Sequence, residues 1–184
     1  MRYYDIEVAG TKRALKLCPI NQDLCIAAFL ILGDTELTVN CAAALLERAP
    51  KYDFLLTAEA KSIPLVQEMA RQNGDAHYIV ARKVYMDNPI CVGVKSITTE
   101  KDQKLYVDKE EMDQMRGKRI LIVDDVISTG RSLQALEEIA AAAGADVVGK
   151  MAVLAEGDAA SRTDISYLEK LPLFNAKGEP LPFD

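Results

Sequence analysis

The segment from Ile120 to Ser132, ILIVDDVISTGRS, constrains the fold of this 184-residue chain more than any other stretch. Its four leading aliphatic residues, Ile120 to Val123, predict a strand that is buried on both faces, as in a parallel sheet covered by helices. A helix is predicted from Arg131 to Ala143, because apolar residues recur there at helical spacing and Gly144 ends the pattern. The segment therefore predicts a strand followed by a helix inside an α/β domain.

The rest of the chain alternates in the same way. Further elements are predicted as a helix over 37–49, a strand over 52–57, a helix over 63–72, a strand over 77–81 and a strand over 147–154. Residues 14–33 are apolar but irregular, being broken by Pro19 and Asn21. The alternation predicts an α/β fold with an open, mostly parallel central sheet flanked by helices.

Length and composition favour one globular domain over residues 1–184. The net charge of -6 disfavours a general grip on nucleic acid, so no DNA partner is expected. The longest apolar run, Cys25 to Leu32, is far shorter than the roughly 20 residues of a membrane span. The first residues also lack the pattern of a secretory signal. We therefore expect a cytoplasmic protein that does not contact a membrane.

The cysteines and the single histidine do not form an ordinary zinc site. Neither a C-x-x-C pair nor a second histidine is present beside His77. We expect reduced, mostly buried thiols at Cys18, Cys25, Cys41 and Cys91. His77 is interpreted as an ordinary strand residue rather than a catalyst.

Two acids and a hydroxyl-rich turn follow the aliphatic strand. Asp124 and Asp125 are expected at its carboxyl end, where open α/β sheets bind ligands. The turn that opens the next helix consists of Ser128, Thr129, Gly130, Arg131 and Ser132. Successive N–H groups and hydroxyls at a helix N-terminus suit a phosphate monoester, and paired carboxylates accept hydrogen bonds from a vicinal diol. The string therefore predicts a ribose phosphate, with its diol on the acids and its phosphate in the turn.

This string closely resembles the 5-phosphoribosyl-1-pyrophosphate (PRPP) signature of type I phosphoribosyltransferases, and the resemblance extends from about Leu15 to Leu154, nearest to the adenine group. It implies transfer of ribose 5-phosphate from PRPP to a nitrogenous base, a purine of the adenine type in first place. Pyrophosphate and a nucleotide would be the products. Asp124 and Asp125 would act as catalytic residues, and Mg²⁺ would be held through PRPP rather than by direct protein ligands. A homodimer is the expected assembly.

The segment LLTAEAKSIPLV, from Leu55 to Val66, is similar to the pyrophosphate loop of that family. The resemblance assigns to the pyrophosphate Glu59, Ala60 and Lys61, together with the basic pair Arg82 and Lys83. Lys61 stands where the family commonly has arginine. Lysine keeps the charge but loses the bidentate fork.

Residues 84–108 take the place of the family's flexible catalytic loop and are predicted to form a β-hairpin or a mobile loop. The chain reads VKSITTEKDQK where the adenine enzymes carry the glutamate-containing SYELEYG. The residues that fall near the missing acids are Ser96, Thr98, Thr99 and Glu100.

The resemblance also divides the chain into a small N-terminal hood over 1–33, a core over 34–154 and a C-terminal extension over 155–184. Val126 and Ile127 would offer apolar contact to a flat base. Glu156 or Asp158, after the last core strand, could reach the same pocket.

A non-catalytic regulator that senses PRPP or a nucleotide on the same fold is the alternative, since the loop sequence is altered. A DNA-binding regulator would need an additional basic helix-turn-helix domain, whereas an RNA-binding one needs only a basic face. Release of pyrophosphate from PRPP across a panel of bases discriminates the enzyme from a regulator.

Overall fold

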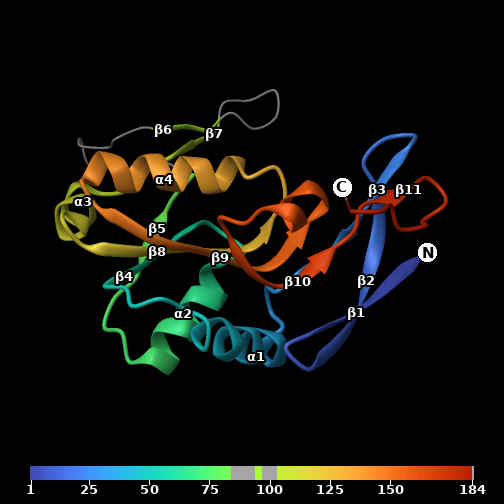
Figure 1. Cartoon of the computed structure of the whole chain (residues 1–184), viewed down its shortest axis with the longest axis horizontal. Coiled ribbons are helices and arrows are strands. Elements are labelled where there is room, and N and C mark those ends of the chain that lie inside the picture. The colour runs from blue at the N-terminus through green and yellow to red at the C-terminus, as the bar shows by residue number, and fades with distance from the viewer. Residues whose placement is uncertain (84–93, 97–102, 184) are drawn as a thin grey trace.

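The fold is taken from a computed structural model, which describes residues 1–83, 94–96 and 103–183 (Figure 1). Five strands form the central sheet in the order β10-β9-β8-β4-β5, and all neighbouring pairs are parallel. In that order their bounds are Ser166–Leu171, Asp146–Glu156, Arg119–Ile127, Phe54–Ala58 and Ile79–Ala81. The predicted open parallel sheet is confirmed.

Helices cover both faces of this sheet (Figure 1). The helices on one face are α1 (Thr35–Leu46) and α2 (Ile63–Asn73), and those on the other are α3 (Lys109–Met115) and α4 (Arg131–Ala143). Leu121 and Val123 of β8 pack in the apolar cluster of α1 and α2, whereas Ile120 and Ile122 pack in the cluster of α3 and α4. All four side chains are fully buried, which confirms a strand covered on both faces.

A second, antiparallel sheet forms the hood, in the order β1-β2-β3-β11. Its strands are Tyr3–Val8, Thr11–Pro19, Leu24–Ala28 and Phe174–Asn175. The stretch over 14–33, for which no strand was predicted, contains most of β2 and all of β3, and buried Leu15 and Leu17 alternate with exposed Lys16 as in a half-buried strand. The interruption at Asn21 is the turn between β2 and β3, where its side chain accepts the N–H of Asp23.

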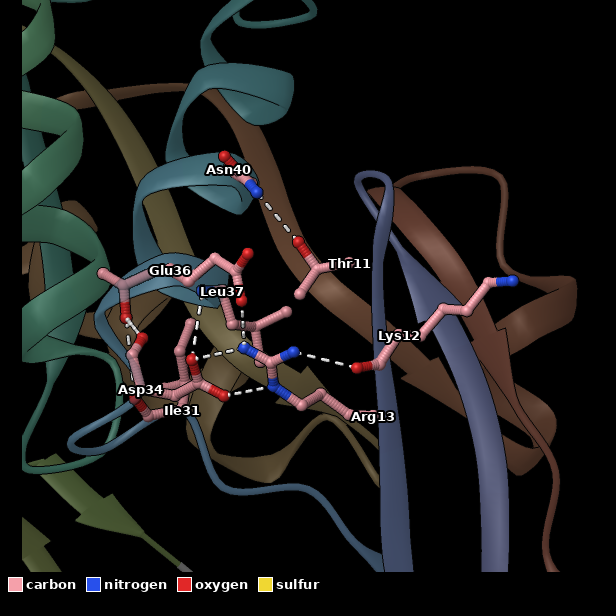
Figure 2. Close-up of polar contacts among 9 residues, drawn as sticks. Thr11, Lys12, Arg13, Ile31, Asp34, Glu36, Leu37 and Asn40 are labelled. Atoms are coloured by element: carbon pink, nitrogen blue, oxygen red, sulfur yellow. Dashed lines mark hydrogen bonds and ion pairs between the residues drawn. The ribbon is translucent and has the colours of Figure 1, made fainter.

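The hood is fastened to the core by polar contacts between β2 and the start of α1 (Figure 2). The Arg13 guanidinium donates to Asp34 Oδ2 at 2.6 Å and Oδ1 at 2.9 Å, and also to Glu36 Oε2 at 2.8 Å. Asn40 donates to Thr11 Oγ1 at 2.8 Å one turn further along the helix. These contacts fix the β1–β2 hairpin against α1.

Several boundaries differ from the sequence predictions for local reasons. Helix α1 begins at Thr35, because the Asp34 side chain accepts the N–H of Leu37, and it ends at Leu46 rather than at residue 49. Strand β8 continues past Val123 to Ile127, so the two acids lie within the strand rather than after it. The elements that were not predicted from the sequence are helix α3 and strands β1, β2, β3, β10 and β11.

The C-terminal residues belong to both sheets, since β10 extends the core and β11 completes the hood. Strands β6 (Val94–Ser96) and β7 (Gln103–Leu105) pair antiparallel, which agrees with the hairpin expected within 84–108. The expectation of a mobile loop falls on 84–93 and 97–102, outside the described residues. Within the described part of the chain, no helix is both long enough and apolar enough to cross a membrane.

Candidate active site

Two adjoining cavities lie where β4 and β8 end. The larger has a volume of about 210 Å³ and is lined by Ala58, Glu59, Ala60, Lys61, Ser62, Lys83, Leu105, Asp124, Asp125, Val126 and Ser132. The smaller, of about 40 Å³, follows the turn from Val126 through Leu133 and also contains Asp124. Asp124, Val126 and Ser132 line both, so Asp124 stands between the segments expected to bind pyrophosphate and 5-phosphate, whereas Asp125 lines the larger cavity.

Ser62 holds the acid pair in place. Its hydroxyl lies 2.7 Å from Asp124 Oδ1, to which it donates, and it accepts the Asp125 backbone N–H at 2.9 Å. Asp125 is only 6% exposed, and its Oδ2 has no hydrogen-bond partner among the described residues. A buried acceptor without a partner is costly, so this oxygen is suited to a hydroxyl or cation brought by a ligand.

Ser62, which was not among the predicted site residues, precedes α2 in the position of a helix cap. Its side chain makes no capping hydrogen bond to that helix and is turned toward the acids of β8 instead. A serine at this position is ordinarily interpreted as an N-cap. Nothing in the local sequence distinguishes the two roles.

The acid pair has unusual electrostatics. Burial, followed by the neighbouring Asp125 carboxylate, raises the pKa of Asp124 above that of a free carboxyl group, while the hydrogen bond from Ser62 acts in the opposite direction. Two carboxylates side by side resist simultaneous ionisation. A donor or cation that neutralises this site would therefore be bound strongly.

The turn before α4 forms an open helix N-terminus. Gly130 is its N-cap residue, with a φ of 74°, and no side chain caps the helix. The first turn of α4 carries no acidic residue, and Ser128 and Thr129 are exposed beside it. Uncapped N–H groups and a partial positive charge suit an anion, as the sequence predicted.

Gly130 has a second role that the sequence did not reveal. A β-carbon built at this position would lie 2.5 Å from Nη1 of Arg162. The absent side chain therefore makes room for an arginine from the C-terminal part of the chain, in addition to permitting the left-handed backbone.

The expected pyrophosphate residues divide into two groups. Glu59 accepts the backbone N–H of Lys83, and the Glu59–Ala60 peptide bond is cis. Lys61 and Lys83 line the larger cavity. Arg82 is not among the residues lining it; its guanidinium faces Asp108 at 3.7 Å, at the start of α3. The lysines, rather than the arginine, are thus brought to the cavity.

Only some of the residues predicted to contact the base line the cavities. Val126 is half-buried and lines both cavities, whereas Ile127 borders the smaller one but is 2% exposed and packs in the α4 cluster. Asp158 is exposed on the short 3-10 helix Gly157–Ser161 and lines neither cavity. Glu156 is half-buried at the end of β9; burial raises its pKa, and the charge of Lys61 opposes that shift.

The flexible-loop candidates are only partly described. Thr98, Thr99 and Glu100 lie outside the described residues, and Ser96 ends β6 but its side chain is not described. Leu105 of β7 lines the larger cavity, so the hairpin borders the site.

The other polar candidates of the sequence do not join this site. His77 is exposed and its ring meets Phe54 edge-on, with 6.2 Å between ring centroids. Cys25 and Cys41 are free and buried, and burial raises the pKa of Cys41 to about 12. Cys18 is free and half-buried, and Cys91 lies outside the described residues. Among the described residues, no three His, Cys, Asp or Glu side chains gather to hold a metal ion.

The chain is similar to known phosphoribosyltransferases. The profile of the phosphoribosyl transferase domain matches residues 38–176. A hypoxanthine/guanine phosphoribosyltransferase of Methanococcus voltae is 34% identical over 110 residues, which are 60% of this chain and 56% of that protein. A xanthine phosphoribosyltransferase of Bifidobacterium adolescentis is 30% identical over 122 residues, covering 63% of this chain and 62% of the relative. The chain spans a little over half the length of these curated relatives.

Solved structures with a similar fold are named for adenine, not for the hypoxanthine, guanine and xanthine of the curated relatives. The adenine phosphoribosyltransferase of Thermoanaerobacter pseudethanolicus superposes with a TM-score of 0.70 at 17% identity, covering 85% of this chain and 95% of that one. The Saccharomyces cerevisiae enzyme complexed with adenine gives 0.68 at 20% identity, covering 84% and 92%. At these identities the likeness establishes the fold alone.

Proposed function

Because the chain belongs to the phosphoribosyl transferase domain family, we propose that it transfers ribose 5-phosphate from PRPP to a purine base. The bond between the anomeric carbon and the pyrophosphate oxygen breaks, and a bond from that carbon to a base nitrogen forms. The nitrogen loses its proton, and pyrophosphate leaves. The observation that carries the proposal is Asp125 in the lining of the larger cavity, because its buried Oδ2 has no hydrogen-bond partner among the described residues.

The 5-phosphate is assigned to the turn before α4. The uncapped N–H groups of this helix and the hydroxyls of Ser128, Thr129 and Ser132 would donate hydrogen bonds to it. The ribose hydroxyls would then reach the acid pair, which shares the smaller cavity through Asp124. A hydroxyl donating to Asp125 Oδ2 would satisfy the one buried carboxylate oxygen that lacks a partner in the described part of the chain.

The acid pair also suits the charge that develops during the reaction. Positive charge grows on the ribose ring as pyrophosphate departs, and a fixed carboxylate nearby stabilises it. Ser62 fixes the orientation of Asp124, so little reorganisation is needed when this charge appears. The same positive charge favours the ionised form of Asp124, whose pKa is raised in the free protein.

The departing pyrophosphate is assigned to the larger cavity, where Lys61 and Lys83 would balance its charge. Mg²⁺ prefers oxygen ligands and commonly combines one or two carboxylates with substrate phosphates. Asp124 and Asp125 offer such carboxylates, and Asp125 Oδ2 is unpartnered, so the residues fit Mg²⁺ held chiefly by PRPP. When bound, the ion would further neutralise the leaving group.

A 6-oxopurine is the base we place first. The curated relatives with 30–34% identity are named for hypoxanthine, guanine and xanthine, whereas the adenine enzymes share less than 25% identity. Val126 would supply apolar contact to the ring, and Glu156, whose pKa responds to the charge of Lys61, is the acid that we assign to the base pocket. This revises the adenine preference that the signature suggested.

The test is release of pyrophosphate from PRPP with Mg²⁺ and each of adenine, hypoxanthine, guanine and xanthine. We expect turnover with at least one oxopurine and none in the double variant Asp124→Asn with Asp125→Asn. The exposed Asp113→Asn on α3 is the matched control and should keep wild-type turnover. If no base gives turnover, the proposed enzyme activity is wrong, and calorimetric binding of PRPP would then support the sensing alternative.

A further inference from the structure

Arg162 stands directly against the turn that the proposed function assigns to the 5-phosphate. It follows the 3-10 helix Gly157–Ser161, and its Nη1 occupies the space where a β-carbon of Gly130 would lie. Its Nε and Nη2 donate to the two carboxylate oxygens of Asp164 at 2.9 and 2.7 Å. Nη1 makes no hydrogen bond to any described residue, so one edge of the guanidinium is fixed and the other meets Gly130.

Asp164 is itself anchored to the core. Lys150 of β9 donates to Asp164 Oδ2 at 2.6 Å and to Glu137 of α4 at 2.9 Å. The side chain of Lys150 is only 15% exposed, and the paired cations lower the pKa of Asp164 well below its usual range. The network therefore connects α4 at Glu137, strand β9 and the turn at Gly130, and it holds Arg162 in one position.

The charges at this helix end run against the usual pattern. A helix N-terminus carries about half a positive charge, so acids ordinarily stabilise it. Here the first helical residue is Arg131, no acid lies in the first turn, and Arg162 adds a second cation beside the N-cap. Asp164 is already engaged by Arg162 and Lys150. Asp164 binds the far edge of the guanidinium, so it is the Nη1 edge of Arg162 that faces the turn, and this arrangement suits an anionic ligand there.

We propose that Arg162 is a positioning residue for the 5-phosphate: packed against Gly130 and fixed by Asp164, it holds the turn in its left-handed conformation and adds positive charge to the phosphate site. The inference rests on the proposed function, because it takes the turn to bind the 5-phosphate of PRPP. Arg162 acts on the phosphate through the turn, not as a direct ligand.

The experiment compares the binding of two probes by calorimetry with Mg²⁺, ribose 5-phosphate for the turn and pyrophosphate for the larger cavity. Arg162→Ala should weaken ribose 5-phosphate binding about tenfold and change pyrophosphate binding less than about twofold, since only one site loses its support. Arg162→Lys should fall between, because lysine keeps the charge but not the two-point bond to Asp164. Arg116→Ala, which removes an exposed arginine paired with Asp113, is the matched charge control and should bind both probes normally.

A purely structural role predicts a different result. Both affinities would then fall together with the melting temperature, and guanidinium ion at non-denaturing concentration would not restore ribose 5-phosphate binding to Arg162→Ala. We expect such rescue, and its absence together with equal losses would overturn the inference. Should Arg162→Ala not fold, Asp164→Asn, which keeps the arginine but weakens its anchor, is expected to show the same selective loss to a smaller degree.

The wild-type protein separates this inference from the proposed function. If wild type binds no ribose 5-phosphate, the assignment of the turn is wrong and the proposed function fails with it. If wild type binds and Arg162→Ala binds equally well, only the role of Arg162 is wrong.

Discussion

The N-terminus of α1 is capped by acidic side chains, whereas that of α4 has no side-chain cap. At α1, Asp34 accepts the N–H of Leu37, Glu36 lies in the first turn, and both acids bind Arg13 of the hood (Figure 2). At α4 the N-cap is Gly130, no side chain caps the helix, and the nearby charged groups include two arginines. Both helices present the same backbone N–H groups and the same dipole.

The difference indicates that the N-terminus of α1 contributes to stability, whereas that of α4 is suited to binding. The chain satisfies the α1 terminus with its own carboxylates, which fastens the hood to the core. The terminus of α3 resembles α1, since Asp108 and Glu111 form a capping box there and Arg82 faces Asp108. Only α4, among these three termini, has no side-chain cap, which leaves its N–H groups available for the anion that we propose. A capping side chain at this position would have contributed about 1 kcal/mol of stability.

The largest expected effect comes from closing the open terminus sterically. Gly130→Ala places a β-carbon 2.5 Å from Arg162 Nη1 at a positive φ, so the Arg162 guanidinium is displaced and the backbone of the turn is strained. Loss of two charge-assisted hydrogen bonds to phosphate should weaken ribose 5-phosphate binding about a hundredfold, measured by calorimetry. Gly74→Ala has a similar φ of 79° with open space around it, so it should lose only stability. Equal binding by both variants would show that the α4 terminus is not the phosphate site.

The next effect concerns opposite pH dependences of two aspartates. The Arg13 hydrogen bond lowers the pKa of Asp34, so its contribution to stability is present near neutral pH and is lost as pH falls through the lowered pKa. Burial raises the pKa of Asp124, so the folded state binds its proton more tightly and stability declines as pH rises toward the raised pKa.

Denaturant unfolding of the ligand-free protein at pH 4, 6 and 8 measures this contrast. Asp34→Asn keeps a good N-cap but loses the ion pair, so it should destabilise by about 0.5–1 kcal/mol at pH 8. Asp124→Asn should instead stabilise by about 1 kcal/mol at pH 8. The Asp124 difference should shrink toward pH 4, whereas the Asp34 difference should persist to pH 4, because the pKa of Asp34 is lowered below that of a free carboxyl group. If Asp124→Asn destabilised the protein at pH 8, the inference that burial and Asp125 disfavour the ionised form of Asp124 would be wrong.

The comparison also explains which features the sequence could predict. Helix α4 matches its predicted bounds, and β8 was recognised because four aliphatic residues in succession leave few alternatives. The same short string placed the acids next to the hydroxyl-rich turn before α4, although the strand continues through the acids to Ile127. These features are encoded locally, within a strand and the helix after it.

The features that were missed depend on partners distant in sequence. Ser62 bonds to Asp124 across 62 positions in the sequence. Arg162, which follows β9 in the sequence, packs against Gly130, which precedes it. Strand β11 is only two residues long and exists because Phe174 and Asn175 pair with β3. Arg82 and Lys83 are adjacent in sequence, so only the position of Asp108 in the fold separates their roles.

The smallest expected effect tests whether Arg82 pairs with the N-cap acid of α3, as Arg13 does at α1, or binds pyrophosphate. Arg82 faces Asp108 at the N-cap of α3, as Arg13 faces Asp34 at α1, whereas Lys83 lines the larger cavity. Lys83→Ala should therefore weaken pyrophosphate binding about fivefold, the range of one partly solvated charge contact, and Arg82→Ala should change it less than about twofold. Calorimetry with pyrophosphate and Mg²⁺ measures both variants. A larger loss in Arg82→Ala would move that arginine from the helix cap to the pyrophosphate site, and would leave α1 as the one terminus closed by an arginine–aspartate pair among the three compared.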